Sequence, residues 1–160
     1  MKQKTLALLL KLVIIGVAVC AAAVYAFIVP EMGRSLAEMD GGEFAHLYTP
    51  WIILISLTAV PVAAALVCAF IIAVNIGRDK SFCLQNAKLL AVISVLAAVD
   101  TAFFFTANLV MLFLNASHPG IVIVSLFICF AGVAVTVAAA ALSHYARKAA
   151  ELQSDSDLTI

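Results

Sequence analysis

Four long apolar segments dominate this 160-residue sequence. Each is long enough, as a helix that rises about 1.5 Å per residue, to cross a hydrocarbon core of about 30 Å. Hydrophobic residues make up 66% of the chain and charged residues only 11%, whereas a soluble domain has about 45–50% apolar and about 25% charged residues. We therefore expect an all-α integral membrane four-helix bundle, with helices near residues 5–29, 51–76, 86–114 and 121–144.

Turn and cap residues mark the predicted helix ends. Pro30 and Gly33 are expected to end the first helix, because proline cannot donate a helical hydrogen bond and glycine weakens a helix. Thr49 is expected to cap the second helix, with Pro50 at its first helical position. The sequence thus predicts a membrane domain over residues 1–148 and a short acidic tail over residues 149–160.

Basic residues fall almost entirely on one side of the predicted membrane. Eight of the nine lie before or at the start of the first helix, between the second and third, or after the fourth, and only Arg34 lies in an opposite loop. The positive-inside rule assigns the basic side to the cytoplasm, so both termini are expected there. Tyr25, Tyr48 and Trp51 are expected in the aromatic belt of the outer interface.

One acid, Asp100, lies near the middle of the third apolar segment. A charged side chain at the centre of a bilayer costs about 2.5–3.5 kcal/mol on insertion scales, so we expect Asp100 to be neutral and to donate a hydrogen bond. Asn108 and Thr101 are expected to extend the same polar region. Two readings follow: an interhelical hydrogen bond that fixes the packing, or a proton or ion site.

The fourth apolar segment carries small or weakly polar residues at helical spacing. Ser125, Cys129, Gly132, Thr136 and Ala140 follow one another at intervals of four, three, four and four residues. Small residues let helix backbones approach closely, which favours helix association inside a membrane. Gly16 in the first segment is expected to allow the same close approach of helices. Packing within one chain explains these residues, and self-association into a homo-oligomer is left open.

The residues of this sequence provide no visible basis for catalysis. The four cysteines form no CxxC pair, the three histidines are dispersed, and there is no phosphate-binding loop, nucleophile elbow or pair of carboxylates. We therefore expect no enzyme activity, no cofactor and no metal site. The formal net charge of zero also argues against direct binding of nucleic acid.

Two predicted cytoplasmic segments carry a family resemblance. They are GRDKSFCLQNAKLLAVIS, residues 77–94, and the terminal DLTI, residues 157–160. Together they resemble the YoaS-like family, small bacterial four-helix membrane proteins classed as a domain of unknown function. The positions that match the family's pattern are Phe82, Asn86, Ala87, Asp157, Leu158, Thr159 and Ile160. Cys83 departs from the pattern, because the family often has a hydroxyl residue there that would cap the third helix.

The resemblance implies location in the bacterial cytoplasmic membrane and a regulatory role. Members are commonly encoded beside a short helix-turn-helix regulator, which a membrane protein could hold away from DNA. Phe82, Asn86 and residues 157–160 are then the expected partner-binding residues. The alternatives are a small channel or proton-coupled transport component built around Asp100, and a structural membrane subunit in which Asp100 holds the third helix in place.

Overall fold

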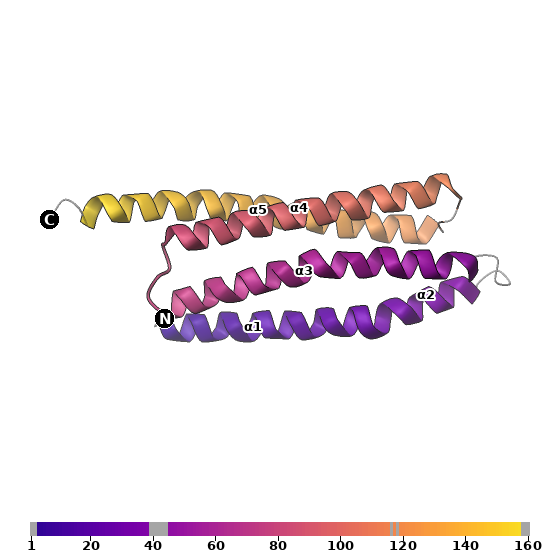
Figure 1. Cartoon of the computed structure of the whole chain (residues 1–160), viewed down its shortest axis with the longest axis horizontal. Coiled ribbons are helices and arrows are strands. Elements are labelled where there is room, and N and C mark those ends of the chain that lie inside the picture. The colour runs from indigo at the N-terminus through magenta and orange to yellow at the C-terminus, as the bar shows by residue number, and fades with distance from the viewer. Residues whose placement is uncertain (1–2, 39–44, 116, 118, 158–160) are drawn as a thin grey trace.

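The computed structural model describes residues 3–38, 45–115, 117 and 119–157 and is helical throughout its regular elements (Figure 1). Four of its helical segments are long and apolar enough to span a membrane, as the sequence predicts. The elements, in chain order, are α1 (Gln3–Ala23), the π-helix η1 (Val24–Ile28), α2 (Val29–Glu38), the 3₁₀ helix η3 (Ala45–Leu47), α3 (Tyr48–Gly77), α4 (Leu84–Phe113) and α5 (Pro119–Asp157).

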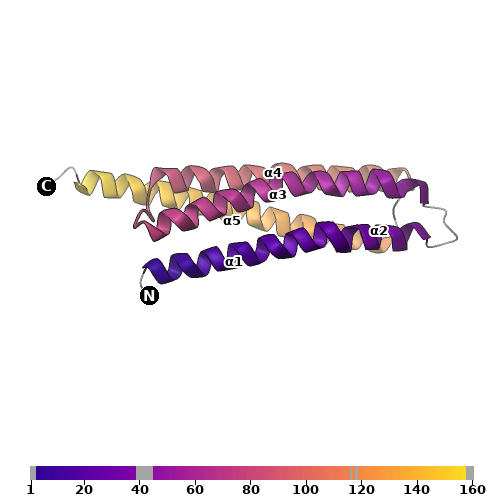
Figure 2. The ribbon, with the colours of Figure 1, turned by 60° about the horizontal axis from the view of Figure 1, so that its bottom comes forward.

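The spanning helices pack in the order α1, α3, α4, α5. Helix α5 lies along α4 over the most extensive contact, α4 packs on α3, and α3 packs on α1 and α2. Figures 1 and 2 show the four spans running side by side, with the end of α3 and the start of α4 joined by a short turn. Within the described ranges, α1 and α2 make no extensive contact with α5. The bundle is therefore open along the side where these helices would meet.

The interior of the bundle is built from small and polar residues rather than from large apolar ones. Among the described residues, the buried apolar ones are Ala7, Ala73, Ala87, Ala139 and Ala150, whereas most of the large apolar side chains are exposed on the helix surfaces. A bilayer solvates Leu, Val and Phe side chains as well as a protein core does, so burying them gains little there. Close backbone approach through small residues holds the helices together instead.

The first predicted helix does not end at Pro30 or Gly33. Helix α1 passes through η1 into α2 and reaches Glu38. A π-helical turn widens the backbone just before Pro30 and provides the local adjustment that a proline inside a helix requires. The sequence prediction was wrong here because it treated Pro30 as a stop signal in a chain whose helix continues past it.

Other helix ends also differ from the prediction. Helix α3 begins at Tyr48 with Leu47 as its N-cap, so Thr49 does not cap it, and Pro50 lies within the first turn. Cys83 is the N-cap of α4 and makes no side-chain capping bond. Helix α5 continues through most of the predicted tail to Asp157, which makes residues 149–157 an extension of the last helix.

Candidate functional site

The connection between α3 and α4 is an ordered turn at the basic end of the bundle. Asp79 adopts a left-handed conformation, with φ of 60°, which aspartate tolerates better than most residues. The amides of Arg78 and Lys80 each donate a 3.0 Å hydrogen bond to the carbonyl oxygen of Asn75. The end of α3 is therefore capped by the turn that leads to α4.

Two buried asparagines hold this turn. The side-chain amide of Asn75 donates a 2.8 Å hydrogen bond to Oδ1 of Asn86, and Nδ2 of Asn86 donates to the carbonyl oxygens of Lys80 at 2.9 Å and Ser81 at 3.0 Å. Asn86 is only 2% exposed. Its side-chain amide is thus satisfied inside the turn, and the residue is buried rather than exposed to a partner.

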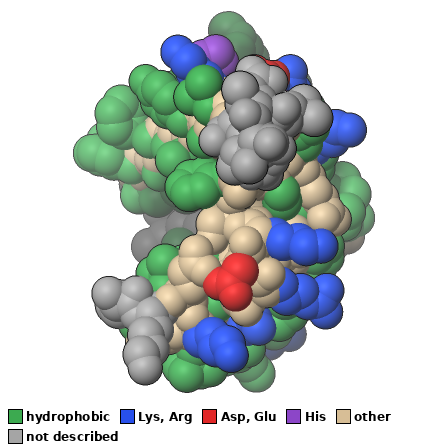
Figure 3. Space-filling view, turned by 90° about the vertical axis from the view of Figure 1, so that its left-hand side faces the viewer, with side chains coloured by type: hydrophobic (Ala, Val, Ile, Leu, Met, Phe, Trp, Pro, Cys, Tyr) green, Lys and Arg blue, Asp and Glu red, His purple; other side chains and the backbone are tan. Residues whose placement is uncertain are grey.

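The other predicted partner-binding residues lie differently. Phe82 is 61% exposed beside the turn and is accessible to another molecule. Asp157 ends α5, and Leu158, Thr159 and Ile160 lie outside the described residues. Figure 3 views the molecule from the end that carries the turn between α3 and α4 and shows Lys and Arg side chains gathered over that end.

The seam between α4 and α5 contains most of the predicted packing residues. Ser125 is buried, and Gly132 and Thr136 are partly buried. A Cβ atom on Gly132 would collide with Oγ1 of Thr101 and would lie 3.2 Å from its Cβ and Cγ2 atoms. Two hydrogen bonds cross the seam: Ser94 Oγ donates to the Thr136 carbonyl at 2.9 Å, and Ser143 Oγ donates to the Ala87 carbonyl at 2.7 Å.

Two predicted packing residues do not lie at helix contacts. Ala140 is exposed, whereas its neighbour Ala139 is buried. The buried or partly buried positions of α5 continue from Thr136 at intervals of three and four residues, through Ala139 and Ser143. Ala140 lies four residues after Thr136, which itself lies four after Gly132, and two successive intervals of four place Ala140 outside the contact face. Gly16 is also exposed, and a Cβ atom there would meet nothing within 4 Å.

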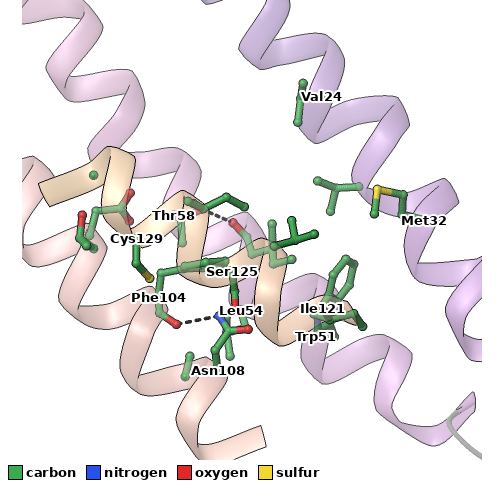
Figure 4. A pocket seen from close by; sticks show the side chains of 18 of the residues that line it. Val24, Met32, Trp51, Leu54, Thr58, Phe104, Asn108, Ile121, Ser125 and Cys129 are labelled. Carbon is green, nitrogen blue, oxygen red and sulfur yellow. Dashed lines mark hydrogen bonds between the residues drawn. The ribbon is translucent and has the colours of Figure 1, made fainter. Parts of the chain in front are cut away.

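A partly open cavity of about 610 Å³ lies between the helices. Its walls come from η1, α2, α3, α4 and α5, and Figure 4 shows side chains from these elements around one space, with Val24 and Met32 on the side opposite Asn108 and Ser125. The lining is mostly apolar with a few polar side chains, the usual character of a small-molecule site. The polar residues that line it are Tyr25, Thr58, Asp100, Thr101, Asn108 and Ser125.

Most of these polar groups are satisfied locally. The Thr101 hydroxyl donates to the Ala97 carbonyl at 2.7 Å, and the Asn108 amide donates to the Phe104 carbonyl at 2.8 Å. The Tyr25 hydroxyl and Thr58 Oγ1 are 2.8 Å apart, and Thr58 donates to the Ile55 carbonyl. Tyr25 and Trp51, which the sequence predicts to lie in the outer aromatic belt, both line the cavity.

Asp100 is the exception. It lies in α4 and lines the cavity together with Thr101 and Asn108, so the structure brings the three predicted intramembrane polar residues to one site. Its Oδ1 atom is buried and has no hydrogen-bond partner within the described part of the chain. The expected interhelical hydrogen bond is therefore not made by this oxygen. A buried polar atom without a partner is costly and calls for an explanation.

The cavity occupies only the half of the bundle remote from the turn at Asn86. Its walls use residues 100–111 of α4, 51–62 of α3 and 120–132 of α5, which are the halves of these helices remote from the turn at Asn86. In the half nearer that turn, Ala73 and Ala87 have no exposed surface, and Ser143 binds Ala87 across the seam. Asp100 and Gly132 therefore lie at the limit of the cavity that faces the turn, and packed small residues fill the bundle beyond them.

Comparison with known proteins identifies the relatives of this chain. The family described as "Protein of unknown function (DUF2975)" matches residues 31–160. The chain belongs to this family. It is also similar to the uncharacterized membrane protein YoaS of Bacillus subtilis (strain 168), at 30% identity over 162 residues that cover 99% of each chain. No solved structure matches. The chain is thus a membrane protein of a family without an assigned function, as the resemblance predicted.

Some features of this family member could not be found from single residues. The hydrogen bond from Asn75 of α3 to Asn86 of α4 is not among the contacts that the sequence analysis predicts. Two asparagines that flank a short turn between apolar helices were the available signal. No feature of the sequence indicates that Tyr25 and Thr58, which are 33 residues apart, lie in contact. Among the described residues, no group of three His, Cys, Asp or Glu side chains could hold a metal ion.

Proposed function

We propose that this chain is a regulatory protein of the bacterial cytoplasmic membrane whose inner end holds a cytosolic helix-turn-helix transcription regulator. The inner end is the one that carries the turn at Asn86. Arg78, Lys80 and Lys88 lie in or beside this turn, and Arg147 and Lys148 lie in the last part of α5. The positive-inside rule supports a cytoplasmic location for this end and for both termini.

The main support for this proposal is the last part of α5, which projects beyond the other helices (Figure 1) and is called the projection below. Ser143 contacts Ala87, only three residues from the start of α4, yet α5 continues for fourteen residues beyond Ser143. At about 1.5 Å per residue, α5 extends about 16 Å past the inner end of α4. Figure 1 shows this last part of α5 standing clear of the other helices. A helix that leaves the bundle in this way presents most of its faces to the cytoplasm.

The side chains on and just before the projection suit a protein partner. Tyr145, just before the projection, and Leu152, on it, are 68% and 64% exposed, and Arg147, Lys148 and Glu151 are exposed between them. Together with Phe82, they supply apolar anchors within a charged surround, the composition by which a helix docks into a groove of a partner. Apolar side chains beyond the bilayer are costly unless lipid headgroups or a partner cover them.

A mild-detergent pull-down from native cells tests the proposal. The tagged wild-type chain should retain a small DNA-binding protein, and a double variant, Tyr145→Glu with Leu152→Glu, should lose it while it inserts into the membrane normally. The matched control is Leu142→Ala, which changes an exposed residue of the same helix within the apolar span. Absence of any DNA-binding protein from the wild-type sample, or equal retention by the double variant, contradicts the proposal.

A second function, proton-coupled transport, is favoured by one observation: the unpartnered oxygen of Asp100 inside the cavity. Intramembrane acids at cavities mark ion and proton pathways in many membrane proteins. A pH-dependent flux in proteoliposomes that Asp100→Asn abolishes would support this second function. The packed inner half opposes a continuous channel, so transport would require the helices around Ala73 and Ala87 to separate.

A further inference from the structure

We propose that the cavity in the outer half of the bundle binds a lipophilic organic cation, with the Asp100 carboxylate as its counter-ion. This site is separate from the partner-binding surface on α5, so it holds or fails independently of the proposed regulatory function. Three separate observations support the proposal. They concern the charge of Asp100, the aromatic residues of the cavity wall, and the opening toward the bilayer.

The electrostatics of the cavity select a cation. Asp100 is the single carboxyl group among the described residues that line it, and none of these described residues is basic. The buried Oδ1 atom lacks a hydrogen-bond donor within the described ranges. A carboxylate in a low-dielectric space requires a positive partner. Without another cation a proton serves as that partner, and a bound organic cation replaces the proton, which leaves for the solvent.

The size and lining of the cavity select a lipophilic molecule. A volume of about 610 Å³ lies within the range of about 300–1,000 Å³ that holds drug-sized ligands. Tyr25, Trp51 and Phe104 contribute aromatic rings to the wall, and aromatic faces attract organic cations. Aliphatic side chains of α2, α3 and α5 make up most of the remainder, so a small hydrated metal ion would gain few ligands there.

The open side of the bundle provides the entrance. The cavity is lined by α2 and η1 on one side and by α5 on the other, and these elements make no extensive contact with each other in the described ranges. Figure 3, which views the molecule from the end that carries the turn, shows its outline indented between the part that carries α5 and the part that carries α1. A molecule dissolved in the bilayer can therefore enter sideways without crossing the packed inner half.

The π-helix η1 lies at this entrance. Val24, Tyr25 and Ile28 of η1 line the cavity, and the Tyr25 hydroxyl is anchored to Thr58 of α3. Single π-helical turns within α-helices occur frequently at functional sites, because they shift side chains out of the regular helical register. Here the turn places the Tyr25 ring at the wall opposite α5.

Equilibrium binding of radiolabelled tetraphenylphosphonium to the purified full-length protein in lipid nanodiscs tests the proposal. We expect saturable binding, little competition by the neutral molecule triphenylphosphine oxide, and affinity at least about tenfold weaker in Asp100→Asn, which removes the charge of a buried ion pair. Equal affinity in Asp100→Asn, or equal competition by the neutral molecule, would overturn the assignment. Absence of saturable binding to the wild-type protein would overturn it as well.

A pair of phenylalanine substitutions checks the site without changing Asp100. Ala107 lines the cavity, whereas Ala102 lies on the same helix with its side chain exposed. Ala107→Phe should fill the cavity and weaken tetraphenylphosphonium binding, and Ala102→Phe should leave it unchanged. Thermal unfolding of each variant without the probe shows whether it is folded. If folded Ala107→Phe binds as well as Ala102→Phe, the cation does not occupy this cavity.

Discussion

Asn75 on α3 donates a 2.8 Å hydrogen bond from its side-chain amide to Oδ1 of Asn86 on α4, and both residues are buried. The second residue also binds two carbonyl groups of the turn between the helices. Ala87 follows directly and accepts a hydrogen bond from Ser143 of α5. The consecutive residues Asn86 and Ala87 of α4 therefore hold α4 to both α3 and α5. These contacts give a physical reason for the Asn-Ala pair in this segment.

Asn86→Ala should lower the thermal stability of the protein in detergent. The substitution removes three hydrogen bonds and leaves the Asn75 amide and two turn carbonyls without their partner, at a cost of about 1–3 kcal/mol. Gln85→Ala is the matched control, since Gln85 is exposed and accepts only a 3.5 Å contact from Asn75. Equal melting temperatures for the two variants would show that the asparagine pair does not hold the turn.

Gly132→Ala should destabilise the bundle by about 1–3 kcal/mol, because the added methyl group collides with the Thr101 side chain. Adding Thr101→Ala should recover most of the loss, since that change removes the colliding hydroxyl and methyl groups. Gly16→Ala, where nothing lies within 4 Å of the added atom, should leave stability unchanged or slightly higher. A double variant no more stable than Gly132→Ala would refute this contact between α4 and α5.

Adjacent alanines of α5 should respond differently to enlargement. Ala139→Leu places a large side chain in the α4–α5 seam and should cost about 1–3 kcal/mol, whereas Ala140→Leu adds an apolar side chain on an exposed surface and should cost little. Thermal unfolding in the same detergent compares the two. The reverse order would show that the contact face follows the register expected from the sequence rather than the register of the structure.

The orientation in the membrane can be measured with single cysteines in a variant whose four native cysteines are replaced by alanine. Glu38→Cys at the end of α2 should react with a membrane-impermeant maleimide in intact cells, because the end remote from the basic residues faces outward. Lys148→Cys on α5 should react only after the membrane is permeabilised. Both residues are exposed. The opposite pattern of labelling would invert the topology and place α5 outside the cytoplasm.

The sequence predicted the fold well because a bilayer imposes strong constraints. Length, hydropathy and the scarcity of charge predict four spanning helices, and the structure has them. Helix ends were harder to predict, because Pro30 stops a helix in water but is accommodated by η1 here. On α5, the predicted packing residues Ser125 and Gly132 are buried and partly buried, whereas Ala140 is exposed, since one extra residue in the spacing turns a position away from the seam.

The candidate site was only partly readable from sequence. Asp100 stands out because an acid is rare in such a segment, and it lines the cavity. The cavity itself depends on η1 and α2 lying apart from α5, a tertiary relationship that no local pattern encodes. Asn86 matched the family pattern, but a motif shows that a residue type fits a position and not whether its side chain points inward or outward.

Photocrosslinking from the projecting part of α5 tests the central claim, partner binding at the inner end, most directly. A benzophenone amino acid replaces Leu152 on the projection in one variant and Leu142 within the apolar span in another, two positions that are both exposed. Irradiation of native cells should crosslink a small helix-turn-helix protein, identified by mass spectrometry, to position 152 and not to position 142. Crosslinks to lipid alone at both positions, or to the same proteins at both, would contradict the claim.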